Sequence, residues 1–373
     1  AAAPAPEEGP QAAPEAAPQA APQAAPEAVP QAAPEATEAV PRAVGPNSWQ
    51  PLISVCVPTC FNRHCFHELL YDNFVKQTYP NLELVVLDTG VLPSQFLEAK
   101  AKDDRRVVYR HYPVRDAKQD LILGKTRPYE PPTNCWSLGL KRNMAVALAS
   151  GDVIAHFDDD DLYAACYLDF MFQKLQEQVP QADGPGGLAA TAAIVTLAEW
   201  HCFDFGAGRF WHINPKTDPN ILDATWRDQM CYGYGFSYVY TRKAWKVQAF
   251  PDTEDCEDDV FMSRLRRQRH VHVGLVKLPS LESGLVAHSY HGGNTGICEF
   301  IGTKRLGTVC EPFGFEGALQ VVASTRSRVP NLRLAPPPSP PASIQRLLAG
   351  PWQAVPIKGK GKGKGKGKGK GKG

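Results

Sequence analysis

Long apolar runs are missing from this sequence. No stretch of about 18 apolar residues occurs in the 373-residue chain, so the sequence predicts no membrane span. The first residues lack the basic and apolar regions of a signal peptide, and the chain begins with Ala, as a fragment or a processed protein would. These absences predict a soluble protein and leave its compartment open, with the cytoplasm as one expectation.

Paired cysteines and glycine-rich phosphate loops are missing as well. Neither the P-loop nor the Rossmann glycine pattern occurs, and no cysteines form a CxxC pair or follow zinc-ribbon spacing. Free or buried thiols are therefore expected at the ten cysteines, Cys56, Cys60, Cys65, Cys135, Cys166, Cys202, Cys231, Cys256, Cys298 and Cys310. A metal site at Cys60, His64, Cys65 and His67 is the alternative, although its spacing fits no standard site.

Low-complexity sequence occupies both ends. Pro recurs at every fourth residue from Pro10 to Pro34, which argues against a helix, and strict Lys-Gly alternation begins at Lys358. Residues 1–46 carry a net charge of −5, the tail +8, and residues 47–357 only −2, so specific nucleic-acid binding is not expected. We expect a disordered Ala/Pro/Glu-rich segment at 1–48, one folded domain at 50–330, and a Pro-rich linker with a disordered Lys-Gly tail at 331–373.

Apolar runs and helical patterns alternate through the middle of the chain. Short runs that fit buried strands occupy 52–58, 82–88, 106–112 and 152–157. Helical patterns occupy 65–77, 94–102, 140–150 and 162–178, and Gly151 is expected to end the third helix in the C′ position. The alternation predicts an α/β fold with a mostly parallel sheet between helices. In such folds, ligands bind beyond the carboxyl ends of the strands.

Acidic residues follow two of the predicted strands. Asp88 ends one strand, and four consecutive aspartates, Asp158–Asp161, follow another. Carboxylates this close raise one another's pKa unless a cation neutralises them, and oxygen ligands suit Mg²⁺ or Mn²⁺. A metal that carries a phosphate or diphosphate is the favoured interpretation. The alternative is a solvated acidic turn that caps a helix starting near Leu162.

Three segments carry a recognisable pattern. ISVCVPTCFNR (53–63), LELVVLD (82–88) and GLKRNMAVALASGDVIAHFDDDD (139–161) together resemble the first half of a family 2 glycosyltransferase with the GT-A (Rossmann-like) fold. The resemblance implies transfer of a sugar from a nucleotide-diphosphate sugar, most often a UDP-sugar, with a divalent metal such as Mn²⁺ or Mg²⁺. One departure is LDTG at 87–90, where the family often has a second acidic residue and Ser.

The same resemblance implies roles for individual residues. Asp158 and Asp160 form the D-x-D pair, with Asp160 as the direct metal ligand, Asp161 in support and Asp159 as the most dispensable of the four. Nucleotide-sugar contacts are implied at Pro58, Thr59, Arg63, Asp88, Arg142 and Asp158. Arg63 and Arg142 suit phosphate or base, and Arg142 has the alternative of a structural ion pair with the aspartates.

The segment PDTEDCEDDVFMSRLRR (251–267) places acids before an amphipathic helix and resembles the "ED" segment of that family. The resemblance implies that Asp258, next to Glu257, is the general base that takes a proton from the acceptor hydroxyl as it attacks the anomeric carbon. Attack opposite the nucleotide inverts the anomeric configuration. Acids that complement a helix dipole are the alternative, and the two roles can coexist.

Candidates in the rest of the second half are fewer. The resemblance implies a late histidine on the metal or diphosphate, His291 or His288, and a surface-loop histidine is the alternative. Tyr232, Tyr234 and Phe236 suit either a sugar-stacking wall or core packing.

The resemblance as a whole implies an inverting, metal-dependent, non-processive glycosyltransferase that acts on a glycan, protein or small-molecule acceptor. The QxxRW and GxGxRxxPxT motifs are absent, which argues against a processive synthase and a nucleotidylyltransferase. Two other hypotheses stay open: a catalytically inactive module that binds a sugar nucleotide or glycan, and an interaction protein whose Lys-Gly tail carries the function. The donor sugar and the acceptor are not predicted.

Overall fold

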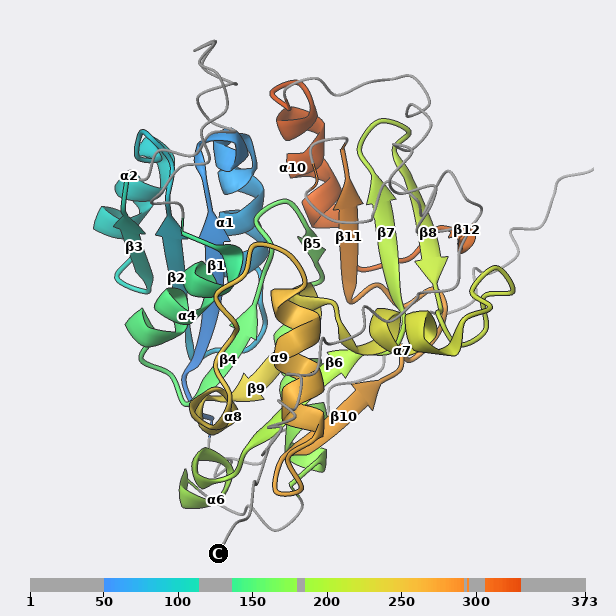
Figure 1. Ribbon diagram of the computed structural model, residues 1–373. Coiled ribbons are helices and arrows are strands. Elements are labelled where there is room, and N and C mark those ends of the chain that lie inside the picture. The colour runs from blue at the N-terminus through green and yellow to red at the C-terminus, as the bar shows by residue number, and fades with distance from the viewer. Residues whose placement is uncertain (1–49, 114–135, 180–184, 292–293, 295–305, 330–373) are drawn as a thin grey trace, which may run out of the picture. The chain divides into compact units, whose positions relative to one another are not determined.

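A computed structural model of the chain describes residues 50–113, 136–179, 185–291, 294 and 306–329 (Figure 1). The predicted terminal segments 1–48 and 331–373 lie outside these residues, as do Cys135 and Cys298. All described residues belong to one compact unit, Trp49–Gly373. No helix in the described ranges is both long enough and apolar enough to cross a membrane.

The central sheet has seven strands in the order β10-β6-β9-β4-β1-β2-β3 (Figure 1). Six of them run in one direction, and β9 is antiparallel to its neighbours β4 and β6. The predicted α/β fold with a mostly parallel sheet is therefore confirmed. The strands are β1 (Ile53–Thr59), β2 (Leu82–Asp88), β3 (Val107–His111), β4 (Val153–His156), β6 (Ala193–Leu197), β9 (Val239–Thr241) and β10 (His272–Val276).

Helices cover both faces of this sheet. Along β1, Ile53, Val55 and Val57 share one apolar cluster, and Cys56 belongs to the other, as the two-residue period of a strand requires. The first cluster receives α1 (His67–Val75), α2 (Gln95–Asp103), α5 (Tyr167–Glu177), α6 (Pro185–Ala190) and α7 (Ala224–Tyr232). The second receives α4 (Leu138–Leu148), α8 (Arg242–Val247) and α9 (Glu257–Arg266).

A second sheet of five strands has the order β12-β8-β7-β11-β5. Its strands are β5 (Leu162–Tyr163), β7 (Trp200–Asp204), β8 (Arg209–Ile213), β11 (Val286–Tyr290) and β12 (Thr308–Cys310). A third apolar cluster joins this sheet to α10 (Glu316–Arg326) and to α1 through Phe203, Ala287, Val322 and Leu69. Short 3-10 helices, η1 (Phe61–Phe66) and η2 (Gly235–Ser237), complete the described elements.

Two predictions about helix ends are wrong. Leu162 and Tyr163 form strand β5, and α5 begins only at Tyr167, so the aspartates do not cap that helix. Helix α4 ends at Leu148, and Gly151 does not have the left-handed backbone of a C′ residue. A Cβ atom at Gly151 would lie 2.3 Å from the Leu52 carbonyl oxygen. Glycine is needed there because two backbone segments approach closely.

Candidate functional site

The candidate site lies where β1, β2 and β4 end. Thr59 and Asp88 are partners in register at the ends of β1 and β2, and Asp158–Asp161 follow β4 after Phe157. Because these three strands are parallel, their carboxyl ends meet at one edge of the sheet. Pro58, the predicted neighbour of Thr59, is partly buried and pairs with Leu87.

The middle two aspartates share one arginine. Arg63, from η1, donates through Nε to Asp159 Oδ1 at 3.0 Å and approaches Asp160 Oδ2 at 2.6 Å through Nη2. His291 Nε2 lies 2.7 Å from the same Asp160 oxygen. Thr59 donates to the other oxygen of Asp159 at 2.5 Å. Both carboxylates are at most 2% exposed, so the protein supplies counter-charges to these two acids itself.

The two carboxylates respond differently to this environment. Burial raises the pKa of Asp159 to about 6 against the attraction of Arg63. Burial acts in the same direction on Asp160, but Arg63 and His291 outweigh it and hold the pKa of that carboxyl well below its usual range. The Oδ1 atom of Asp160 is buried and has no hydrogen-bond partner among the described residues. This atom is a free acceptor inside a charged site.

The outer two aspartates face a different set of groups. His288 Nδ1 lies 2.9 Å from both oxygens of Asp161, and the Ser289 amide donates to Oδ1 at 2.8 Å. Burial raises the pKa of Asp161 to about 7 despite His288. Asp158 is one-quarter exposed and lies 3.6 Å from Arg142 Nη2.

One ligand atom each from Asp158, Asp161 and His288 lie within 4.8 Å of one another. Two carboxylates and one imidazole form a donor set that fits a divalent cation. The sequence predicted Asp158, Asp160 and His291 as ligands, so the two sets share Asp158. In the alternative cysteine-histidine site, the side chains have separate partners: Cys60 contacts Asn62, His64 contacts Asp88, and His67 contacts Thr59 and Ser94.

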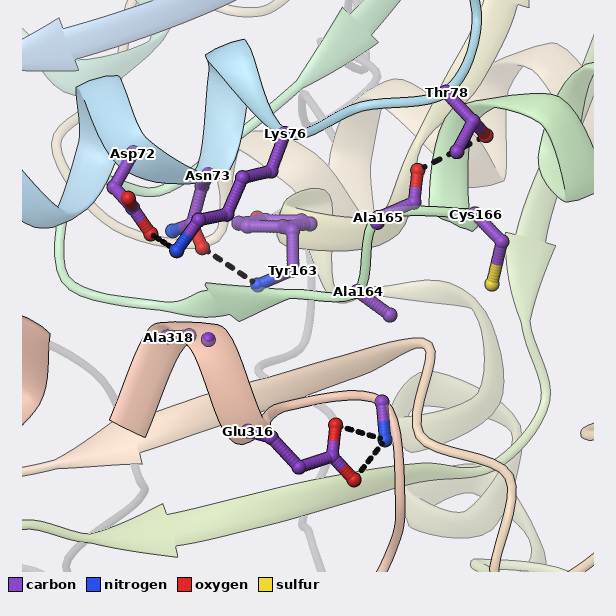
Figure 2. Close-up of a pocket in the computed structure, with 12 residues that line it drawn as sticks. Asp72, Asn73, Lys76, Thr78, Tyr163, Ala164, Ala165, Cys166, Glu316 and Ala318 are labelled. Atoms are coloured by element: carbon purple, nitrogen blue, oxygen red, sulfur yellow. Dashed lines mark hydrogen bonds and ion pairs between the residues drawn. The ribbon is translucent and has the colours of Figure 1, made fainter. Parts of the chain in front are cut away.

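Asn73 and Tyr163 hold the aspartate segment in place. Asn73, on α1, donates to the Asp161 carbonyl at 2.7 Å. It also accepts from the Tyr163 amide at 3.2 Å (Figure 2). The Tyr163 hydroxyl accepts from the Asp158 amide and donates to the Phe236 carbonyl, both at 3.0 Å. Both side chains are buried, so the backbone on either side of the four aspartates is fixed. No sequence signal marked either residue.

The same two side chains line a cavity of about 400 Å³. Figure 2 shows it between α1, the segment after β5 and α10, with Lys76, Cys166 and Glu316 also on its wall. None of the predicted site residues lines this cavity.

Asp88 is fully engaged by the protein. Its Oδ2 accepts from Tyr109 at 2.6 Å and lies 3.0 Å from His64 Nε2, and its Oδ1 accepts from the Gly90 amide at 2.7 Å. Burial raises the pKa of Asp88, but the bonds from His64 and Tyr109 outweigh burial and hold it below its ordinary value. The carboxylate therefore organises the loop after β2.

The first turn of α9 carries a second acidic cluster, Glu257, Asp258 and Asp259. Asp258 accepts from the Gly235 amide at 2.9 Å and from the Asp259 amide at 2.8 Å. Burial, and then the charge of Glu257, raise the pKa of Asp258 to about 7. A Cβ atom at Gly235 would lie 3.3 Å from the Asp258 Cβ, so a glycine lets η2 approach the carboxylate closely.

Arg142 joins the two acidic clusters. It is 3% exposed, donates through Nε to Glu257 at 3.0 Å, and approaches Asp158 at 3.6 Å. Its Nη1 also lies 3.5 Å from His156, and burial holds the pKa of that histidine well below its usual range. The base candidate Asp258 is therefore next in sequence to an acid that shares an arginine with the metal candidate Asp158.

The predicted aromatic wall is divided. The Phe236 ring stacks on His288 at 4.8 Å between centroids, and Tyr234 packs against Trp200 at 5.0 Å. Tyr232 instead packs against Arg266, whose guanidinium carbon lies 3.6 Å from the centroid of the Tyr232 ring. Phe236 is buried, so its contact with His288 is a packing contact within the site.

No family model matches the chain, and no protein of curated function matches it. Among solved structures, S. aureus TarS is 16% identical with a TM-score of 0.42, and the match covers 64% of this chain and 37% of that chain. The UDP-GlcNAc complex of TarS 1–349 is 14% identical with a TM-score of 0.42 and coverages of 73% and 66%. The chain thus spans less than two thirds of the length of these TarS chains.

Two further solved structures match over more of their length. The mannosyltransferase PcManGT from Pyrobaculum calidifontis, in complex with GDP-Man and Mn²⁺, is 16% identical with a TM-score of 0.39, and the match covers 81% of this chain and 79% of that chain. Glucosyl-3-phosphoglycerate synthase from Mycobacterium tuberculosis, in complex with Mn²⁺, UDP and phosphoglyceric acid, is 20% identical with a TM-score of 0.36 and coverages of 75% and 79%. The similarity of this chain to these proteins is one of backbone structure, at low sequence identity.

Proposed function

We propose that the chain is a metal-dependent glycosyltransferase that moves a sugar from a nucleotide-diphosphate sugar, with a UDP-sugar as the first donor to test, to an acceptor hydroxyl. One observation carries the proposal: Arg142 contacts Asp158 at 3.6 Å and Glu257 at 3.0 Å. It thereby brings a candidate metal and diphosphate site next to a candidate general base. Group transfer from a metal-bound diphosphate needs both in one place.

The proposed metal site uses Asp158, Asp161 and His288, whose ligand atoms lie within 4.8 Å of one another. When bound there, a divalent cation would neutralise negative charge on the departing nucleotide diphosphate. The sequence-based set of Asp158, Asp160 and His291 is the competing proposal. The 2.6 Å contact of Arg63 with Asp160 supports the first set, and the unpartnered Oδ1 of Asp160 supports the second.

Asp258 is the proposed general base. Its pKa of about 7 matches the value at which a carboxylate accepts a proton efficiently near neutral pH. Two backbone amides fix its orientation, and they leave lone pairs on both oxygens for an acceptor hydroxyl. Proton removal by Asp258 would make the acceptor oxygen a nucleophile, and attack opposite the nucleotide would invert the anomeric configuration.

The residues proposed to bind the nucleotide come from β1, η1, β2 and α4. Arg63 and Arg142 supply positive charge beside the aspartates and are proposed to attract the diphosphate before it binds. Thr59 and Pro58 shape the first loop. Asp88 already accepts hydrogen bonds from the protein on both oxygens. Its proposed contribution to binding of the nucleotide's base is therefore to hold the 88–90 loop.

The test is a donor screen that measures UDP or GDP release with and without Mn²⁺ for the wild type, Asp158→Asn and Asp258→Asn. We expect Mn²⁺-dependent release with at least one donor, lost in both variants. Asp259→Asn is the matched control, since it removes a charge from the same helical turn. Release that needs no metal, or that survives both substitutions, would overturn the mechanism.

A second candidate function is an inactive module that binds a sugar nucleotide. The observation in its favour is that the Asp258 carboxylate already accepts two backbone bonds. Such a module would show a thermal shift with UDP and Mn²⁺ and no turnover with any donor or acceptor. An enzyme would show both.

A further inference from the structure

A chain of buried polar side chains leads from the aspartates to α2. Thr59 donates to Asp159 Oδ2 at 2.5 Å, and the Thr59 oxygen lies 2.9 Å from His67 Nε2. His67 Nδ1 lies 2.7 Å from Ser94 Oγ. Ser94 is the N-cap of α2, where it accepts from the Leu97 amide. His67 is fully buried, and Thr59, Asp159 and Ser94 are at most 4% exposed.

The direction of every bond in this chain is determined. Thr59 donates its one hydroxyl proton to Asp159 Oδ2, because a carboxylate oxygen accepts. The Thr59 oxygen then accepts from His67, which requires the proton on Nε2. Burial lowers the pKa of His67 to about 3, so the ring carries only that proton. Nδ1 is left to accept from the Ser94 hydroxyl.

Ser94 also connects to the other end of the candidate nucleotide site. Its amide donates to the Tyr109 hydroxyl at 2.7 Å, and that hydroxyl donates to Asp88 Oδ2 at 2.6 Å. Asp88 in turn holds the Gly90 amide. A continuous set of hydrogen bonds therefore joins the loop after β2 to Asp159, the residue that holds Arg63.

We propose that His67 is a positioning residue, which in its Nε2–H form orients Thr59 toward Asp159 and fixes the loop after β2 and the aspartate segment in one geometry for a nucleotide. That the ligand is a nucleotide rests on the proposed function. The assignment of the His67 tautomer rests only on the hydrogen bonds described above. Preorganised polar side chains in a low-dielectric interior transmit position because each has a single satisfied arrangement. Loss of one directed bond is therefore expected to weaken binding at a distance.

The first measurement needs no variant. Nitrogen-15 NMR of histidine-labelled wild type should show a neutral His67 protonated on Nε2 at neutral pH. Assignment uses the spectrum of His67→Gln, from which the His67 signals are absent. A ring protonated on Nδ1, or on both nitrogens, would overturn the proposal whatever the protein binds.

The second measurement compares two variants that each keep half of the ring's function. Gln reaches as far as Nε2 and keeps a donor for Thr59, whereas Asn reaches only as far as Nδ1 and keeps an acceptor for Ser94. Both lose one buried hydrogen bond, so a merely structural role lowers their stability and their affinity alike. We expect His67→Gln to stay within about threefold of the wild-type Kd for UDP with Mn²⁺, and His67→Asn to raise it about tenfold.

Equal Kd values for the two variants, measured by calorimetry at matched folded fractions, would overturn the positioning role. Thr59→Ser and Thr59→Val are a second pair and are expected to split in the same way, since only serine keeps the hydroxyl. A wild type that binds no UDP with Mn²⁺ would contradict the proposed function instead, and the NMR result would still decide the tautomer.

Discussion

Two acidic clusters lie close together in this protein and differ in what faces them. The aspartates at Asp158–Asp161 meet arginine and histidine side chains, whereas Asp258 in the first turn of α9 meets backbone amides and the acidic neighbour Glu257. The contrast in pKa is between Asp160 and Asp258, because the pKa values of Asp159 and Asp161 are also raised, to about 6 and about 7. The pKa of Asp160 is held well below its usual range, and the pKa of Asp258 is raised to about 7.

The comparison shows how aspartate can serve two different functions in one protein. A carboxylate that is held by both an arginine and a histidine, as Asp160 is, stays ionised and is suited to hold charge, such as a metal with its diphosphate. A buried carboxylate without a dedicated cation exchanges its proton near neutral pH and is suited to remove one. Arg142 contacts Asp158 in one cluster and Glu257 in the other, so it can fix the position of the two clusters relative to each other.

The largest expected effect is that of Asp258→Asn on catalysis. We expect kcat to fall by about 10²–10⁴-fold, because the amide cannot accept the acceptor proton. In the wild type, kcat should rise with pH and level off above pH of about 7, since the deprotonated carboxylate is the active form. The measurement is kcat against pH for both proteins. A variant that keeps wild-type kcat and the same pH limb would contradict the assignment of the base.

The next effect is on stability. Arg142→Met leaves Glu257 buried without its cation, and the free energy of unfolding should fall by about 3–5 kcal/mol. Arg266→Met is the matched control, because Arg266 pairs with the exposed Asp228 and such a pair contributes about 0–1 kcal/mol. Urea unfolding of both variants measures the difference. Equal losses would show that Arg142 does not hold the clusters together.

Asp161→Asn and Asp160→Asn separate the two proposed ligand sets. If Asp158, Asp161 and His288 hold the metal, Asp161→Asn should weaken Mn²⁺ binding by about 100-fold, or about 3 kcal/mol, and Asp160→Asn by much less. The measurement is Mn²⁺ titration by electron paramagnetic resonance. The reverse order would assign the metal to Asp160 and His291.

The smallest effect is expected for Asp259→Asn. This carboxylate lies in the same turn as Asp258, but it has Gln229 as a hydrogen-bond partner. Its contribution through the helix dipole is about 0.3–1 kcal/mol of stability, and kcat should stay within about twofold of the wild type, which is under about 0.5 kcal/mol. A loss of kcat as large as that of Asp258→Asn would move the base to Asp259.

The sequence predicts β1, β2 and β4 because each is a mostly apolar segment that is buried almost throughout. It does not mark β6, β9 or β10 of the same sheet. It does not predict the second sheet. β7 and β8 mix aromatic residues with His and Arg, and β5 has only two residues, so no apolar run or regular alternation marks them. Gly151 is mispredicted because its reason, the nearby Leu52 carbonyl, is a contact between two chain segments.

The site divides in the same way. The aspartates are visible because they are consecutive, and Asp258 because it begins an amphipathic helix. Their partners are distant in sequence: Arg63 is 96 residues from Asp159, and His288 is 127 residues from Asp161. Local sequence patterns identify the acidic residues. Only the fold shows that basic side chains of the same protein, such as Arg63 and His288, already contact them. The argument that four aspartates require a metal is therefore weaker than the sequence suggests.

The most direct test of the central claim is Mn²⁺ binding in the presence of UDP, measured by electron paramagnetic resonance for the wild type and Asp158→Asn, since Asp158 belongs to both proposed ligand sets. The account predicts that UDP tightens Mn²⁺ binding by the wild type and that Asp158→Asn loses the effect. A wild type that binds Mn²⁺ no better with UDP than without it, or an Asp158→Asn variant that binds as the wild type does, would contradict it.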